Sequence, residues 1–158
     1  MARDVENALP YVLHIRAEHR RLREALRRIL TLFPQREEPS PEAALSPEQL
    51  VDKLSALRRD LAHHFAEEES GGCLDEATAR CPSLLPETRA IEAEHAALMD
   101  ELDGIIERAR ACRPPGCTAE MARRFRTFAR SLYAHEAAEN RVLGQAFGGE
   151  FDVDDVEQ

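Results

Sequence analysis

The sequence predicts an all-α protein, an antiparallel up-down-up-down four-helix bundle. Apolar residues recur at steps of three and four through four long segments, which is the spacing of amphipathic helices, and proline-rich stretches separate these segments. Aromatic residues make up only 5% of the chain and Trp is absent, a composition that suits packed helices better than a sandwich or barrel. The 158 residues fit one domain, so we expect residues 1–149 to form the bundle and residues 150–158 to be an acidic tail.

Three breaks set the expected helix boundaries. The stretch 33–49 contains four Pro, the stretch 112–118 contains two Pro and a Gly, and a third break lies at 80–86. Proline disrupts a helix interior because it lacks an N–H and clashes with the preceding turn. Helices are therefore expected before, between and after these stretches, and the modest loops favour antiparallel neighbours.

The first two expected helices lie on either side of the first break. The apolar stripe of the first helix consists of Val12, Ile15, Leu22, Leu26, Ile29 and Phe33. The second helix should begin after Ser46, a favourable N-cap, with Pro47 at the first helical position and Glu48 near the positive end of the helix dipole. Its stripe consists of Leu50, Leu54, Leu57 and Leu61. Gly71 and Gly72 leave the end of this helix open.

The third and fourth expected helices lie on either side of the break at 112–118. The stripe of the third consists of Leu84, Thr88, Ile91, Leu98, Leu102 and Ile105. The fourth should begin near Thr118, which is followed by an acidic residue in the same way as Ser46. Its stripe consists of Met121, Phe125, Phe128, Leu132, Val142 and Ala146.

Ionisable residues occupy the positions where these stripes call for a Leu or an Ile. The first and third stripes each have a single His in a gap, and the second and fourth each have a His and a Glu four residues later. The six residues are His19, His64, Glu68, His95, His135 and Glu139. Burying so many unpaired polar groups would cost several kcal/mol for each of them. We therefore expect a common partner in the core, and a metal ion is the partner that suits this set.

The six residues also share a depth in the expected bundle. Counted from the proline-rich ends, they lie about 14 to 21 residues along their helices, which at about 1.5 Å per residue places them in a layer about 10 Å thick. Their order repeats, because each half of the chain has a single His and then an H-x-x-x-E pair whose members lie on one helix face. Two helix hairpins related by a pseudo-two-fold axis would supply a centre for two metal ions.

The donor types narrow the choice of metal. Imidazoles and carboxylates suit iron, manganese or zinc, and the lack of a thiolate argues against an iron–sulfur cluster. Glu68 and Glu139 as bridging carboxylates favour dinuclear iron or manganese over structural zinc. A ferritin-like site would need Glu-x-x-His on two helices, and only His95, with Glu92, has this spacing. The four Cys lack C-x-x-C spacing and are expected to be free thiols.

The remaining His residues, the net charge and the apolar runs bear on additional ligands, on nucleic-acid binding and on the membrane. His14 and His63 are expected at the surface or just outside the centre, and His14 is the better candidate for an additional ligand. The net charge of -9 argues against nucleic acid as the main partner. No apolar run approaches the roughly 20 residues that a membrane span needs. The first residues lack the apolar segment of a signal peptide, so we expect a cytoplasmic protein.

These motifs resemble those of the hemerythrin-like, HHE cation-binding family. HFAEEE at 64–69 resembles the family's H-F-x-x-E-E signature, AHEAAEN at 134–140 resembles its second copy, and AEHRRL and AEHAAL resemble its single-His segments. The resemblance covers about residues 8–147. It implies a four-helix bundle with a non-haem di-iron centre, oxo- or hydroxo-bridged, in which the six residues named above are the ligands.

The sequence departs from the oxygen-carrying hemerythrins at two positions. Those proteins have a His where this chain has Ile91, and an Asp where it has Asn140, so that Glu139 would take the role of the Asp. The set of four His and two Glu is closer to the oxygen- and iron-responsive hemerythrin-like domains. We therefore expect a di-iron protein that binds or senses oxygen, peroxide or nitric oxide. The alternatives are a peroxide-decomposing enzyme and an iron-responsive interaction module without turnover.

Overall fold

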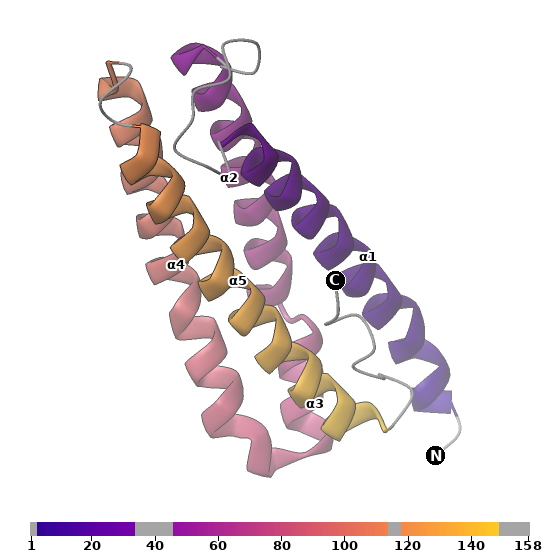
Figure 1. Cartoon of the computed structure of the whole chain (residues 1–158). Helices are drawn as coiled ribbons and strands as arrows, with labels where there is room; N and C mark the ends of the chain where they lie inside the picture. Colours follow the sequence, from indigo (N-terminus) through magenta and orange to yellow (C-terminus); the bar gives the residue numbers. More distant parts are fainter. Residues whose placement is uncertain (1–2, 34–45, 114–117, 149–158) are drawn as a thin grey trace.

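A computed structural model describes residues 3–33, 46–113 and 118–148, with side chains from residue 10 onward, and its long helices form an antiparallel bundle (Figure 1). The long helices are α1 (Arg3–Leu32), α2 (Pro47–Glu69), α4 (Leu85–Ala111) and α5 (Thr118–Phe147). Each runs opposite to the long helix before it, and both α1 and α4 pack against α2 and α5. The predicted all-α, up-down-up-down bundle is confirmed.

The beginning of α2 follows the predicted capping chemistry. The hydroxyl of Ser46 accepts a hydrogen bond from the backbone N–H of Gln49 at 3.2 Å, and the Gln49 side chain accepts one from the backbone N–H of Ser46 at 3.0 Å. This reciprocal pair satisfies two N–H groups that a helix leaves unbonded at its start. Pro47 occupies the first helical position, where its missing N–H has no cost.

A short helix that the sequence pattern did not predict connects α2 and α4. The helix α3 (Cys73–Arg80) and the 3-10 turn η1 (Pro82–Leu84) follow α2, which ends at Glu69. Gly71 adopts a positive φ of 80°, which only Gly adopts readily, and this turns the chain away from α2. The apolar side of α3 is buried and packs mainly against α5. The connection therefore closes one end of the bundle.

Two apolar clusters fill the bundle, one on each side of a polar layer. The larger cluster takes its side chains from residues 22–32 of α1 and Phe33 just after it, 54–65 of α2, 98–109 of α4 and 121–132 of α5. The smaller cluster consists of Ile15, Cys73, Leu74, Ala77, Leu84, Ile91, Val142 and Leu143. On α1, Ile15 belongs to one cluster and Leu22 to the other, with His19 between them. The predicted gap in the stripe is thus a physical boundary in the core.

Three remaining expectations concern the membrane, the tail and the cysteines. Of the helices that the structure describes, none is both long and apolar enough to cross a membrane. The expected acidic tail at 150–158 lies outside the described residues. Cys73 and Cys81 are free thiols, as expected, but Cys112 is disulfide-bonded, so the expectation of free thiols is wrong at that position.

The turn after α2 has no room for a side chain at Gly72. A Cβ at this residue would lie 2.6 Å from the backbone oxygen of Glu68 and 2.6 Å from the hydroxyl of Tyr11. We expect Gly72→Ala to lower the free energy of unfolding by about 1–3 kcal/mol, because backbone atoms must move to make room. Urea titration followed by circular dichroism measures this change.

Gly104→Ala is the matched control, because a Cβ at Gly104 in α4 would have no neighbour within 4 Å. It should leave stability unchanged or raise it by up to about 1 kcal/mol, since Ala favours a helix over Gly. Equal stability of the two variants would contradict the prediction.

Candidate metal centre

The structure brings the six predicted residues together in the polar layer. His19 comes from α1, His64 and Glu68 from α2, His95 from α4, and His135 and Glu139 from α5. All six are buried, with exposed fractions between 0% and 3%. Their helical spacing explains the convergence, because residues four apart in one helix lie one turn apart on the same face. Each H-x-x-x-E pair therefore presents both of its side chains to the bundle axis.

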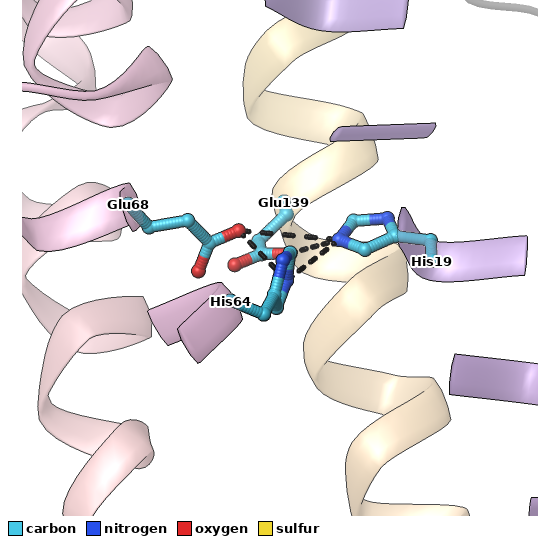
Figure 2. Close-up of side chains that lie close together, drawn as sticks. All are labelled: His19, His64, Glu68 and Glu139. Carbon is cyan, nitrogen blue, oxygen red and sulfur yellow. Dashed lines mark hydrogen bonds and ion pairs between the residues drawn. The ribbon is translucent and has the colours of Figure 1, made fainter. Parts of the chain in front are cut away.

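The six side chains form two overlapping groups. In each group, one potential ligand atom per residue lies within 4.8 Å of every other. The first group consists of His19, His64, Glu68 and Glu139 (Figure 2), and the second consists of Glu68, His95, His135 and Glu139. The two carboxylates belong to both groups. The arrangement provides two neighbouring positions for metal ions that share Glu68 and Glu139.

The first group directs two imidazoles and two carboxylates at one point. In Figure 2 the ring nitrogens of His19 and His64 face each other beside the carboxylates, and the two Nε2 atoms are 3.2 Å apart. Nε2 of His19 lies 3.0 Å from Oε2 of Glu139, and Nε2 of His64 lies 3.1 Å from Oε1 of Glu68. This separation fits a hydrogen bond between the two rings, and it also fits two imidazoles bound to one cation at the usual metal–nitrogen distance of about 2.0–2.1 Å.

The second group uses the other oxygen of each carboxylate. Nε2 of His135 lies 3.1 Å from Oε1 of Glu139, and Nε2 of His95 lies 3.3 Å from Oε2 of Glu68. Glu68 therefore directs Oε1 to one group and Oε2 to the other, and Glu139 does the same with its two oxygens. This is the arrangement that a bridging carboxylate needs.

The bonding of the buried atoms indicates that the site suits a cation. Both oxygens of Glu68 and Glu139, together with Nε2 of His95 and His135, have no well-aligned hydrogen bond within the described residues. Leaving a buried polar atom unsatisfied costs about 1–3 kcal/mol, and more for a charged group. Metal ions would satisfy all of these atoms at once, and they would balance the two buried carboxylates. The residues present therefore fit a two-metal centre.

Strong electrostatic coupling marks the metal-free network. Burial alone would lower the pKa of His19, but the neighbouring Glu139 and Glu68 outweigh it and raise this pKa from 6.5 to about 10. The same balance raises the pKa of His95 to about 10. Burial opposes ionisation of Glu68 and Glu139, yet the surrounding imidazoles lower the pKa of Glu68 and hold that of Glu139 well below 4.5. Without metal, protons on the imidazoles balance the carboxylates.

Three further Glu residues orient the imidazoles, and the apolar periodicity of the sequence does not distinguish them from other acidic residues. Each accepts a hydrogen bond from an Nδ1–H, which turns the Nε2 atom of the same ring toward the centre. Glu18 binds His64 at 2.9 Å, Glu69 binds His95 at 2.8 Å and Glu94 binds His135 at 2.8 Å. A signal for two of them exists in the sequence, because Glu18 and Glu94 directly precede the two single His residues in the repeated A-E-H motif.

The pseudo-two-fold pattern breaks around His19. On the other side of the centre, Phe65 stacks on His95 with ring centroids 4.0 Å apart, and Glu69 holds Nδ1 of that ring. Glu136 and Asn140 occupy the corresponding sequence positions in the second half. Glu136 is fully buried, Nε of Arg23 lies 2.6 Å from its Oε2, and burial raises its pKa. The two halves thus share their inner residues but differ in the groups that surround them.

The remaining sequence candidates lie outside the two groups. His14 and His63 are exposed, and neither belongs to the buried groups. Ile91, one turn before His95, is part of the smaller apolar cluster. Glu92, which completes the single ferritin-like Glu-x-x-His spacing, is in neither group.

The fold and the site together define a helical-bundle protein with a buried His/Glu metal site. A family model described as the hemerythrin HHE cation-binding domain matches residues 11–146. The chain belongs to this family, and it is a metal-binding hemerythrin-like protein. The comparisons find no matching curated protein and no matching solved structure. The family assignment confirms the resemblance seen in the sequence motifs.

The pKa shifts predict how the stability of the metal-free protein depends on pH. Because the pKa values of His19 and His95 are raised in the folded protein, their protonation stabilises the fold. This contribution is complete below pH 6.5 and is lost as the pH rises toward about 10. The pKa values of Glu68 and Glu139 are lowered in the folded protein, so their ionisation also stabilises the fold. This contribution is present above pH 4.5 and is lost as the pH falls below that value. Urea titrations of chelator-treated protein should give a higher free energy of unfolding near pH 6 than near pH 9.

The double variant His19→Gln, His95→Gln provides the comparison for this measurement. Its stability should change less between the two pH values, because two of the four imidazoles whose pKa is raised are gone. A wild-type profile that is level between pH 6 and pH 9 would be evidence against the coupling.

Proposed function

We propose that the chain is a non-haem di-iron protein that binds or senses oxygen or a related small molecule such as peroxide or nitric oxide. The proposed ligands are His19, His64, Glu68, His95, His135 and Glu139. The observation that carries the proposal is the division of oxygens, since Glu68 and Glu139 each direct one oxygen to each pair of imidazoles. This division suits two ions held side by side better than one ion.

The donor set supports iron as the metal. Each position offers two imidazoles and one oxygen from each of two carboxylates, and no thiolate. Such a set suits iron, with manganese or zinc as weaker candidates. Iron held by these residues would supply an exchangeable coordination position for a small ligand and would transfer electrons to or from that ligand. Membership of a cation-binding family also supports a metal cofactor.

The surrounding residues would control this chemistry. Glu18, Glu69 and Glu94 hold three of the imidazoles in position, so that their Nε2 atoms face the centre before metal binds. The two apolar clusters on either side of the layer exclude bulk water, which favours a small uncharged ligand such as a diatomic gas over a large polar substrate. The Phe65 ring stacked on His95 adds to this apolar surround.

Metal analysis tests the proposal directly. Protein produced with iron should contain about two irons per chain and absorb visible light as an oxo- or hydroxo-bridged pair does. Glu68→Ala and Glu139→Ala should lose most of the iron because each removes a ligand from both positions, while circular dichroism shows that the helices remain. Glu92→Ala is the matched control, since this residue is in neither group. A stable, colourless protein that takes up no iron would refute the proposal.

The same iron-loaded sample separates the candidate functions. Oxygen, nitric oxide or peroxide is added to the reduced protein, and the visible spectrum is followed. A stable, reversible spectral change supports binding or sensing. Sustained consumption of peroxide would instead support the peroxide-decomposing enzyme. If iron loading changes the stability of the protein or its binding to a partner, and the protein does not respond to these molecules, the result would support the iron-responsive interaction module.

Glu94→Gln tests the role of the outer carboxylates. The variant replaces the acceptor of the His135 Nδ1 hydrogen bond with a neutral amide on the exposed side of α4. We expect metal affinity to fall by about 10- to 100-fold, because outer hydrogen bonds of this kind fix the ligand ring and raise its basicity. Competition with a chelator measures the change, and Glu87→Gln on the same helix is the control. Unchanged affinity in Glu94→Gln would rule out this role.

A further inference from the structure

A second group of His and Glu side chains lies between α1 and α2, outside the buried centre. It consists of His14 and Glu18 on α1 and of His63 and Glu67 on α2. Each pair is spaced i, i+4, so both members lie on one face of their helix. The pairs therefore repeat, nearer to solvent, the H-x-x-x-E spacing of the buried residues.

The side chains of this outer group converge across the two helices. Nε2 of His14 lies 3.1 Å from Oε2 of Glu67 and 3.6 Å from Oε1 of Glu18. Nε2 of His63 lies 3.3 Å from the other oxygen, Oε1, of Glu67. One ligand atom from each of His14, Glu18 and Glu67 lies within 4.8 Å of the other two. Three donors at these separations match the protein contribution to an open, water-completed metal site.

The four side chains of the outer group range from nearly buried to exposed. The side chain of Glu18 is 10% exposed, that of Glu67 is 34%, that of His14 is 45% and that of His63 is 69%. Ion pairs at this exposure add little to stability, typically about 0–1 kcal/mol, so the fold does not depend on this convergence. The group remains accessible to ions from solvent while one of its carboxylates reaches into the core.

We propose that His14, Glu18 and Glu67 bind one divalent transition-metal ion, with His63 beside Glu67 at the edge of the site. Imidazole with two carboxylates suits Zn²⁺, Co²⁺, Mn²⁺ or Fe²⁺. The existence of this outer site does not depend on the proposed di-iron function, because none of its four residues is among the proposed ligands of the buried centre.

Glu18 connects the outer site to the buried centre. Its Oε2 accepts the hydrogen bond from Nδ1 of His64, while its Oε1 faces His14. An ion bound to Oε1 would draw electron density from the carboxylate and so weaken its hold on the His64 ring. Occupancy of the outer site should therefore alter the spectrum of iron in the buried centre, and this consequence alone rests on the proposed function.

Metal counting with Zn²⁺ tests the outer site on the iron-loaded protein. We expect one Zn²⁺ per chain in addition to the iron, measured by equilibrium dialysis and elemental analysis. His14→Ala and Glu67→Gln should each weaken this Zn²⁺ by at least about tenfold, the lower limit found even for outer partners of a metal ligand. Asp60→Asn, on the exposed face of α2, is the matched control. No additional Zn²⁺, or equal Zn²⁺ affinity in His14→Ala and wild type, would overturn the inference.

A second arm keeps this result separate from the buried centre. The variant Glu68→Gln, Glu139→Gln removes the two carboxylates that both inner positions share, which leaves only two imidazoles at each position, and it should still bind one Zn²⁺ that His14→Ala abolishes. If wild type takes up no iron yet binds this Zn²⁺, the di-iron proposal fails and the outer site stands. In iron-loaded wild type, Zn²⁺ should shift the visible spectrum, and His14→Ala should remove the shift. A His14-independent Zn²⁺ in the inner variant would contradict the site.

Discussion

Two carboxylates buried among four imidazoles are the constraint on which the rest of this structure depends. Glu68 and Glu139 are almost completely inaccessible, and neither has a well-aligned hydrogen bond within the described residues. Such a layer is tolerable only if positive charge lies within it, whether as protons on His19 and His95 or as metal ions. The apolar clusters on both sides, the outer carboxylates and the four-helix arrangement all serve to assemble this layer and to separate it from water.

Much of this arrangement follows from the sequence, because the polar layer interrupts a periodic pattern. A His in place of Leu, as at His19, stands out where the helical spacing is regular, so the fold and the burial of all six inner residues were predictable. Helix α3 could not be predicted in this way, because its eight residues are too few for a periodic stripe. The outer carboxylates were missed for a different reason. Glu69 and Glu94 are half exposed and cannot be distinguished by pattern from ordinary surface acids until the His rings are placed.

The order of the inner residues repeats in the two halves of the chain, but the residues around them differ. Glu18 and Glu94 each precede a single His and each hold the ring of a His on the next long helix. The third such contact, from Glu69 to His95, is not seen in the second half, where Asn140 is the counterpart of Glu69. Nδ1 of His19 accordingly has no hydrogen bond within the described residues. The two sides of a symmetric donor set thus lie in different electrostatic surroundings, which is a physical basis for two metal positions with different properties.

The outer hydrogen bonds also limit how far neighbouring helices can shift along the bundle axis. They join each long helix to the next one in the chain, from α1 to α2 through Glu18, from α2 to α4 through Glu69, and from α4 to α5 through Glu94. A slide of one residue, about 1.5 Å, along the bundle axis would break a hydrogen bond of 2.8 Å. The polar layer therefore helps to set the axial register of the bundle, together with the apolar clusters, and a substitution that shortens one of these side chains removes one of its three constraints.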